Sequence, residues 1–170
     1  MDTIDFIIEK HKSVNQKYDG HDYSLHLKAV AAQARKWANV VQLDAPDKSI
    51  VELAAWGHDL IEDTRMTYND VVDIIGQLGA EIVFACTEST GRSRAERHDD
   101  VFFARLTANP LGVFVKLCDL IANTLYGKLT VSSMAKVYER EWPHYKEKLA
   151  DYMDRFAPMF QYLDKLHNLD

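Results

Sequence analysis

The sequence AAWGHDLIEDT, residues 54–64, places an imidazole next to a carboxylate at His58 and Asp59 and adds two carboxylates at Glu62 and Asp63. In a helix, Glu62 and Asp63 lie one turn beyond the His-Asp pair, so the four side chains can project toward one space. Adjacent imidazole and carboxylate groups offer a hard cation two ligands from consecutive residues. Taken alone, the run is equally compatible with a solvated acidic helix face.

Two other polar residues favour the metal site. His26 lies in the segment YSLHLKAV and Asp119 lies in the segment KLCDLIANT, and both segments have the apolar spacing of helices. With His58 and Asp59 they form a set of two imidazoles and two carboxylates from three predicted helices. Such a set suits Mn²⁺, Fe²⁺, Co²⁺ or Zn²⁺ better than a thiolate site would. We expect His26, His58, Asp59 and Asp119 to bind one divalent cation, with Mn²⁺ as the leading candidate.

These motifs resemble the HD-domain superfamily of metal-dependent phosphohydrolases. The His-Asp pair that continues into Glu-Asp-Thr, together with KLCDLIAN at residues 116–123, is most similar to the hydrolase domain of the RelA/SpoT family and to the small alarmone hydrolases. The similarity covers about residues 17–125. Lys17 stands where the family usually has an arginine, and Leu125 stands where a second arginine is common.

The resemblance implies an HD-type helical bundle with a mononuclear metal site that hydrolyses a nucleotide. The leading activity is that of a guanosine 3′,5′-bis(diphosphate), or (p)ppGpp, 3′-pyrophosphohydrolase. Hydrolysis of (p)ppApp or of a nucleoside 5′-monophosphate is the alternative within the same superfamily. A non-catalytic nucleotide-sensing module is the alternative outside enzymes, and the presence of every expected ligand and carboxylate disfavours it.

Glu62 and Asp63 are the candidate catalytic residues. They lie one turn from the ligand pair, where a carboxylate can orient a water molecule, accept its proton or protonate the leaving oxygen. We assign the water to Glu62 and a supporting role to Asp63, and the opposite assignment stays open. A structural alternative is that both carboxylates cap the helix or pair with Arg65.

Candidate substrate contacts come from cationic and amide side chains. Residues 91–97 concentrate three arginines, which suit an extended phosphate group, although a solvated arginine-rich loop is the alternative. Asn123 shares a helix face with Asp119 and could bind ribose or phosphate. Lys116 could contact phosphate or be a plain solvated lysine. The expected substrate-binding set is Lys17, Lys116, Asn123, Arg92, Arg94 and Arg97.

Length and charge limit the remaining possibilities. A chain of 170 residues fits one domain, with the motifs in about residues 17–125 and the C-terminal helices completing the core. The net charge of −6 disfavours nucleic-acid binding, which normally requires a basic stripe. The sequence has neither an apolar run of about 20 residues nor a basic signal-peptide start, and its two cysteines lie in apolar helical contexts. We expect a cytoplasmic protein whose partner is a small nucleotide, without membrane or nucleic-acid partners.

Helical periodicity runs through nearly every longer segment and predicts an all-α chain. The expected helices cover about residues 3–11, 24–41, 48–61, 68–78, 80–87, 94–107 and 111–128, followed by a helical tail. Gly79 should separate two helices, and Pro143 should break or kink the tail because an internal proline costs about 3 kcal/mol. The last apolar helix most simply covers the core, with a homo-oligomer contact as the alternative.

Overall fold

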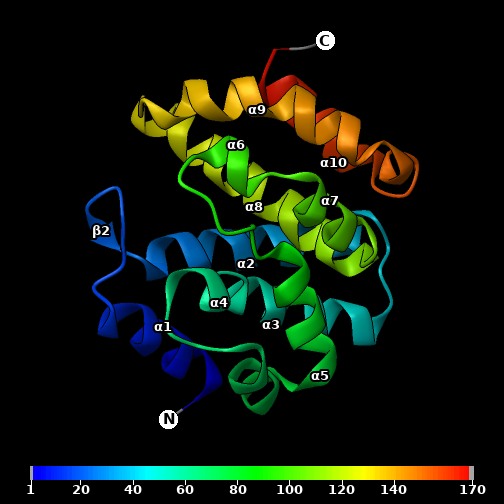
Figure 1. Cartoon of the computed structure of the whole chain (residues 1–170). Coiled ribbons are helices and arrows are strands. Elements are labelled where there is room, and N and C mark those ends of the chain that lie inside the picture. The colour runs from blue at the N-terminus through cyan, green and yellow to red at the C-terminus, as the bar shows by residue number, and fades with distance from the viewer. Residues whose placement is uncertain (1, 169–170) are drawn as a thin grey trace.

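Helices form most of the described part of the protein, and the strands in this part form one short hairpin (Figure 1). The computed structural model describes residues 2–168. Its elements, in chain order, are α1 (Thr3–Ser13), β1 (Lys17–Tyr18), β2 (His21–Asp22), α2 (Ser24–Val40), α3 (Ala45–Gly57), α4 (Leu60–Asp63), α5 (Tyr68–Cys86), α6 (Arg94–Arg97), α7 (Asp100–Thr107), α8 (Pro110–Thr130), α9 (Met134–Lys148), a 3-10 turn (Ala150–Tyr152) and α10 (Ala157–Leu166). The two strands are antiparallel. The all-α prediction is confirmed.

Helix α8 is the centre of the bundle. Most of its residues are buried, whereas a helix at the surface has a single buried stripe. It packs against α2, α3, α5, α7, α9 and α10, and Figure 1 shows it between the layer of α2 and α3 and the layer of α9 and α10. The side chain of Asn109 caps its start by accepting a hydrogen bond from the Gly112 amide at 2.9 Å. The polar residues Lys116, Asp119 and Thr124 of α8 are therefore buried in the interior.

Helices α2 and α3 pack closely because small residues line their contact. Ala31 and Ala34 of α2 and Ala54 and Ala55 of α3 are completely buried. Side chains of this size let two helix backbones approach each other, which brings the start of α2 near the end of α3. His26 lies at the first of these places and His58 at the second.

Two helix boundaries differ from the prediction. The helix expected at residues 48–61 begins at Ala45, where Asp44 caps it, and already ends at Gly57. The helix expected at residues 94–107 is divided into α6 and α7. The division arises because Asp99 starts a new helix by accepting a hydrogen bond from the Phe102 amide at 2.8 Å.

Breaks in two helices differ from the prediction. The break in α5 lies at Gly76, with φ of 77° and ψ of 169°, and the expected break at Gly79 is wrong. Helix α9 continues through Pro143, so a break there is wrong, and the alternative of a kink stays a prediction. Its neighbours Trp142 and Tyr145 are each only 1% exposed, and burial of two large aromatic side chains offsets the hydrogen bond that the proline removes.

The end of the chain covers the core, as predicted. Helix α10 packs against α8, and the four buried apolar residues of this end are Phe156, Met159, Phe160 and Leu163. Cys86 and Cys118 are both buried and unpaired, in agreement with the absence of a disulfide framework in the sequence.

No single helix within residues 2–168 has the length and hydropathy needed to cross a membrane. Helices α7 and α8 meet these requirements only as a pair, and they are bent by 116° relative to each other.

The break in α5 predicts the effect of a substitution at Gly76. No atom lies within 4 Å of the position that a methyl group on this residue would occupy, so an added side chain costs only backbone strain. We expect Gly76→Ala to lower the free energy of unfolding by about 1 to 3 kcal/mol, because side chains rarely adopt this positive φ. Urea denaturation measures the change. The exposed Asp73→Ala on the same helix serves as control and should change stability by less than about 0.5 kcal/mol; equal effects of the two would contradict the prediction.

Candidate metal centre

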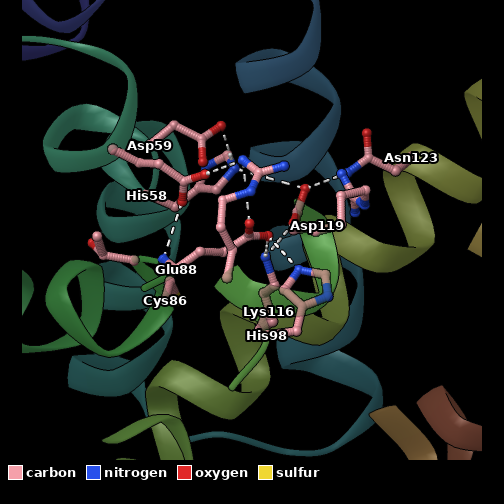
Figure 2. Close-up of polar contacts among 12 residues, drawn as sticks. His58, Asp59, Cys86, Glu88, His98, Lys116, Asp119 and Asn123 are labelled. Carbon is pink, nitrogen blue, oxygen red and sulfur yellow. Dashed lines mark hydrogen bonds and ion pairs between the residues drawn. The ribbon is translucent and has the colours of Figure 1, made fainter. Parts of the chain in front are cut away.

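Three helical segments bring the predicted ligands together. His26 lies in the first turn of α2, His58 and Asp59 lie between α3 and α4, and Asp119 lies in the middle of α8. Figure 2 shows His58, Asp59 and Asp119 facing one another across the interior of the bundle. Both imidazoles and the carboxylate of Asp119 are buried. Residues that are far apart in sequence therefore meet at one point, as the sequence predicts.

The ligand atoms have the spacing of a coordination sphere. His26 Nε2 lies 3.2 Å from His58 Nε2 and 3.3 Å from Asp119 Oδ1, and His58 Nε2 lies 3.7 Å from Asp119 Oδ1. Donors held about 2.1 Å from one cation are about 3.0 Å apart in an octahedral site and about 3.4 Å apart in a tetrahedral site. The group His26, His58 and Asp119 could therefore hold a metal ion.

Asp59 touches this group from one side. Its Oδ2 atom lies 2.9 Å from His58 Nε2 and 3.5 Å from His26 Nε2, and it accepts a hydrogen bond from the Tyr23 hydroxyl at 2.5 Å. The set of mutually close ligand atoms consists of His26, His58 and Asp119. The geometry thus supports a three-residue set, and Asp59 as the fourth ligand stays a prediction.

A break between two helices allows His58 and Asp59 to face the same point. The sequence predicts both residues near the end of one helix, but α3 ends at Gly57 and Asp59 has φ of −99° and ψ of 4°. Consecutive side chains on an uninterrupted helix point about 100° apart. Because the chain leaves the helical conformation at Asp59, its carboxylate turns back toward the preceding imidazole.

The surroundings of His58 leave a lone pair directed at the other ligands. Its Nδ1 atom lies 2.8 Å from the carbonyl oxygen of Ala55, which can only accept, so Nδ1 carries the hydrogen and Nε2 is the free ligand atom. His26 is oriented by stacking on Tyr18, with ring centroids 4.8 Å apart. The imidazole nitrogens of His26 and His58 and the carboxylate of Asp119 therefore converge on one point, which suits a cation.

The pKa values of His58 and Asp119 also indicate that this group of residues favours positive charge. Burial by itself lowers the pKa of His58, but the carboxylates of Asp59 and Asp119 raise it well above its usual value. Burial by itself raises the pKa of Asp119, but Lys116 and the two imidazoles hold it well below its usual value. A divalent cation can replace the protons that these groups otherwise attract.

Asp119 is held in place by two neighbours from its own helix. The Nζ atom of Lys116 lies 3.1 Å from Asp119 Oδ2, and the side-chain amide of Asn123 donates to Asp119 Oδ1 at 2.6 Å. Lys116 is buried, so the alternative of a solvated lysine is wrong. Asn123 also accepts a hydrogen bond from the Tyr18 hydroxyl at 2.8 Å. Both residues orient the ligand carboxylate, and their predicted contacts to substrate stay predictions.

A cavity of about 150 Å³ lies beside the ligand atoms. Its walls combine ligands, further carboxylates, cations and tyrosines: His26, Asp59, Asp119, Glu62, Asp63, Glu88, Arg94, Lys116, Asn123, Leu120, Tyr18, Tyr23, Tyr138 and Tyr145. A second cavity, of about 210 Å³, shares Tyr18 and Tyr138 with the first and contains Lys17. A larger cavity, of about 620 Å³, lies between α1 and the start of α5 and contains none of the predicted site residues.

Glu62 and Glu88 form a pair of carboxyl groups with very different acidities. Glu62 Oε2 accepts a hydrogen bond from the Glu88 amide at 3.1 Å. Burial, and then the charges of Glu88 and Asp59, raise the pKa of Glu62 to about 7. Although burial opposes it, contacts with His98, Lys116 and Arg97 lower the pKa of Glu88 to about 2. Glu62 is therefore the carboxyl that can exchange a proton near neutral pH.

The pKa of Asp63 is raised as well. Burial, followed by the charge of Asp59, raises its pKa, while the Tyr23 hydroxyl opposes that rise. The arginine beside the candidate catalytic carboxylates is Arg97, whose Nη1 lies 3.6 Å from Glu62 Oε1 and 3.5 Å from Glu88 Oε2. The expected alternative partner, Arg65, is exposed.

Glu88, His98 and Tyr145 are site residues that the sequence does not reveal. His98 has no predicted partner, yet its Nε2 lies 2.8 Å from Glu88 Oε1 and 3.1 Å from the Tyr145 hydroxyl. Figure 2 shows His98 and Lys116 on the same side of Glu88. These residues come from separate segments with no shared motif, so only their packing brings them together.

The three predicted arginines occupy different places. Arg94 lines the cavity, and Arg97 contacts Glu62 and Glu88. Arg92 is exposed and does not belong to the cavity wall; its backbone amide donates to Glu96 at 2.8 Å. Lys17 is exposed on β1 at the second cavity. Of the three arginines, Arg94 is thus the one whose position best fits the predicted contact with phosphate.

Comparisons with known proteins add no relative. No family model matches the sequence, and no curated protein matches it significantly.

The ligand geometry predicts that the protein binds about one divalent ion per chain when reconstituted with Mn²⁺. We expect His58→Ala and Asp119→Asn each to abolish this binding, because each removes a ligand atom from a buried set. Metal analysis after gel filtration measures the content. His144→Ala, which removes an exposed histidine on α9, should keep the ion. Equal, negligible metal in the wild type and both ligand variants would contradict the prediction.

The raised pKa of Glu62 predicts how the stability of the metal-free protein depends on pH. Between the ordinary value of 4.5 and about 7, the folded state binds more protons at Glu62 than the unfolded state does. Stability from this group is therefore present at low pH and lost as the pH rises through that interval. Relative to Glu62→Gln, the wild type should lose about 2 to 3 kcal/mol between about pH 5 and about pH 8.

Urea denaturation in the presence of a chelator measures this difference. Glu147→Gln, at an exposed carboxylate of α9, is the control and should follow the wild type at every pH. A wild type and a Glu62→Gln variant with parallel pH dependences would show that Glu62 has no raised pKa.

Proposed function

We propose that this protein is a metal-dependent nucleotide phosphohydrolase of the HD-domain superfamily, and that it acts as a (p)ppGpp-type 3′-pyrophosphohydrolase. One observation carries the proposal. His26 and Asp119, two members of the buried group that could hold a metal ion, line the same cavity as Glu62, whose pKa is about 7. A cation site next to a carboxyl that exchanges protons near neutral pH is suited to hydrolysis of a phosphate ester or anhydride.

Different residues of the cavity have different roles in hydrolysis. A divalent cation bound by His26, His58, Asp119 and Asp59 would stabilise charge on the phosphoryl group and increase the acidity of water. Glu62 orients the attacking water and accepts its proton, and Asp63 supports this step. Tyr23 holds Asp59 through its hydroxyl, and Asn123 holds Asp119, so the carboxylates keep their orientation during turnover.

We assign different parts of the substrate to the two cavities. Ligand pockets usually have volumes of about 300 Å³ or more, so the cavity of about 150 Å³ beside the ligand atoms suits a phosphoryl group rather than a whole nucleotide. The neighbouring cavity is lined by Tyr18, Tyr126 and Tyr138 and offers aromatic surfaces for a base. Lys17 at this second cavity supplies a positive charge for a further phosphate.

The alternatives differ in the substrate or in turnover itself. Hydrolysis of (p)ppApp or of a nucleoside 5′-monophosphate uses the same metal site with another occupant of the second cavity. In a nucleotide-sensing module the cavity binds but does not hydrolyse, and the position of Glu62 beside the ligand atoms disfavours this alternative. The proposal includes a cytoplasmic protein that needs no nucleic-acid or membrane partner, and it leaves a homo-oligomer open.

Substrate hydrolysis tests the proposal directly. We expect the Mn²⁺-loaded protein to hydrolyse ppGpp with a higher kcat/KM than ppApp or any nucleoside monophosphate. Glu62→Gln should keep the metal and lower kcat by at least about 100-fold, because an amide of the same size cannot accept the proton. Chromatographic identification of products from a nucleotide panel measures both effects.

The control for this experiment is Glu147→Gln, which alters an exposed carboxylate and should keep full activity. Near wild-type turnover by Glu62→Gln would assign the residue a structural role. A monophosphate preferred by tenfold or more would instead favour the nucleotidase alternative, and binding without any turnover would favour the sensing module.

A further inference from the structure

Helix α9 reaches the cavity although it lies outside the part of the sequence that carries the motifs. Tyr138, Glu141 and Tyr145 recur at three- and four-residue intervals and therefore share one face of α9. Tyr138 and Tyr145 line the cavity, and Glu141 contacts Arg94, which lines it from α6. The same helix is tied to α10 on another side by an ion pair between Lys146 and Asp164 at 2.7 Å.

Arg94 and Glu141 form a bidentate ion pair. The Nε atom of Arg94 donates to Glu141 Oε1 at 2.6 Å, and its Nη2 atom donates to Glu141 Oε2 at 2.9 Å. The guanidinium group also lies 5.8 Å from the ring centroid of Tyr138. Such paired, charge-assisted hydrogen bonds fix the plane of the guanidinium as well as its position.

The ion pair leaves part of the guanidinium available to an anion. An arginine side chain has N–H groups on Nε, Nη1 and Nη2, and Glu141 uses one from Nε and one from Nη2. Both N–H groups of Nη1 and the second one of Nη2 form the other edge of the plane. Because Arg94 lines the cavity, this edge can bind two oxygens of a phosphoryl group.

The backbone that carries Arg94 is already held in place. The Ser89 amide donates to the Arg97 carbonyl at 3.0 Å, and the Ser89 hydroxyl donates to Asp99 at 2.7 Å, so the two ends of the loop are joined. A methyl group on Gly91 would lie 2.7 Å from the Glu96 Cβ atom, which shows how closely the loop folds on itself. The Arg94 side chain is then the part that Glu141 immobilises before a ligand binds.

Without Glu141, Arg94 would be attracted mainly to another carboxylate of the same cavity. Glu88 is the next carboxylate that acts electrostatically on Arg94, and it lines the cavity. A released guanidinium would be drawn toward Glu88 and into the space that a phosphoryl group needs. Glu141 therefore holds Arg94 at the cavity wall and keeps the cavity open.

We propose that Glu141 is a positioning residue that aligns Arg94 to bind the second phosphoryl group of a diphosphate. The inference rests on the proposed function for the identity of the substrate, but it can be tested by binding alone. It assigns to α9 a part in selecting diphosphates over monophosphates.

Two measurements test the role of Glu141. Calorimetric titration of the Mn²⁺-loaded protein with inorganic pyrophosphate should show about tenfold weaker binding for Glu141→Gln and for Arg94→Ala. With ppGpp as substrate, Glu141→Gln should raise KM about tenfold while kcat changes less than about twofold. Glu141→Asp, which keeps the charge on a shorter side chain, should recover part of the affinity. Metal content and thermal unfolding are compared for every variant.

Matched controls separate positioning from a general effect on α9. Lys146→Gln breaks the other ion pair of this helix, whose exposed fractions of 33% and 18% resemble the 35% and 19% of Arg94 and Glu141. It should leave pyrophosphate affinity and KM unchanged. The double variant Arg94→Ala/Glu141→Gln should bind no more weakly than Arg94→Ala, because Glu141 acts through Arg94.

The outcomes distinguish this inference from the proposed function. Pyrophosphate binding that depends on Glu141, without hydrolysis of any nucleotide, supports the positioning role and contradicts the enzymatic proposal. Hydrolysis of ppGpp with unchanged or tighter pyrophosphate binding by Glu141→Gln contradicts the positioning role alone. Failure of the wild type to bind pyrophosphate, or an equal loss with Lys146→Gln, also overturns it.

Discussion

The structure depends on a buried group of electron-rich atoms that needs positive charge. Nε2 of His58 lies 2.9 Å from Asp59 Oδ2 and 3.2 Å from Nε2 of His26, while its Nδ1 hydrogen is directed to the Ala55 carbonyl. In a low-dielectric interior such acceptors repel one another unless a proton or a metal ion lies between them. The donors around the group, Lys116, Asn123 and Tyr23, hold its carboxylates in place and leave the centre to a cation.

Two further carboxyl groups that line the cavity, Glu88 and Glu62, differ in their charge state. Lys116, Arg97 and His98 surround Glu88 and keep its carboxylate ionised, whereas at Glu62 burial and the charges of Glu88 and Asp59 outweigh the nearby cations. Two carboxyl groups of the same residue type thereby acquire pKa values of about 2 and about 7. The network around Glu88 is thus what leaves Glu62 free to exchange a proton, and it depends on residues from α6, α8 and α9 and on His98, which directly follows α6.

Local features explain which expectations agree with the structure. Helical periodicity and the polar residues within apolar segments indicate the bundle and the convergence of His26, His58 and Asp119, because each signal depends on neighbours within one or two turns. The errors at residue boundaries have equally local causes. Gly76 and Gly79 are indistinguishable by residue type, and only packing decides that Gly76 adopts the positive φ while Gly79 is buried against Ile75.

By itself, the sequence determined the all-α class and indicated that His26, His58 and Asp119 come together beside Glu62 and Asp63, because these features repeat at the period of the helix or lie next to one another in the chain. Tertiary structure alone decided that Lys116 is buried, that His98 contacts both Glu88 and Tyr145, and that Glu141 rather than solvent holds Arg94. Those contacts join residues up to 47 positions apart in the sequence and arise when the packing of the helices brings their segments together. The physical reason is that a side chain's charge state and partners depend on which surfaces are removed from water, and that is a property of the packed molecule.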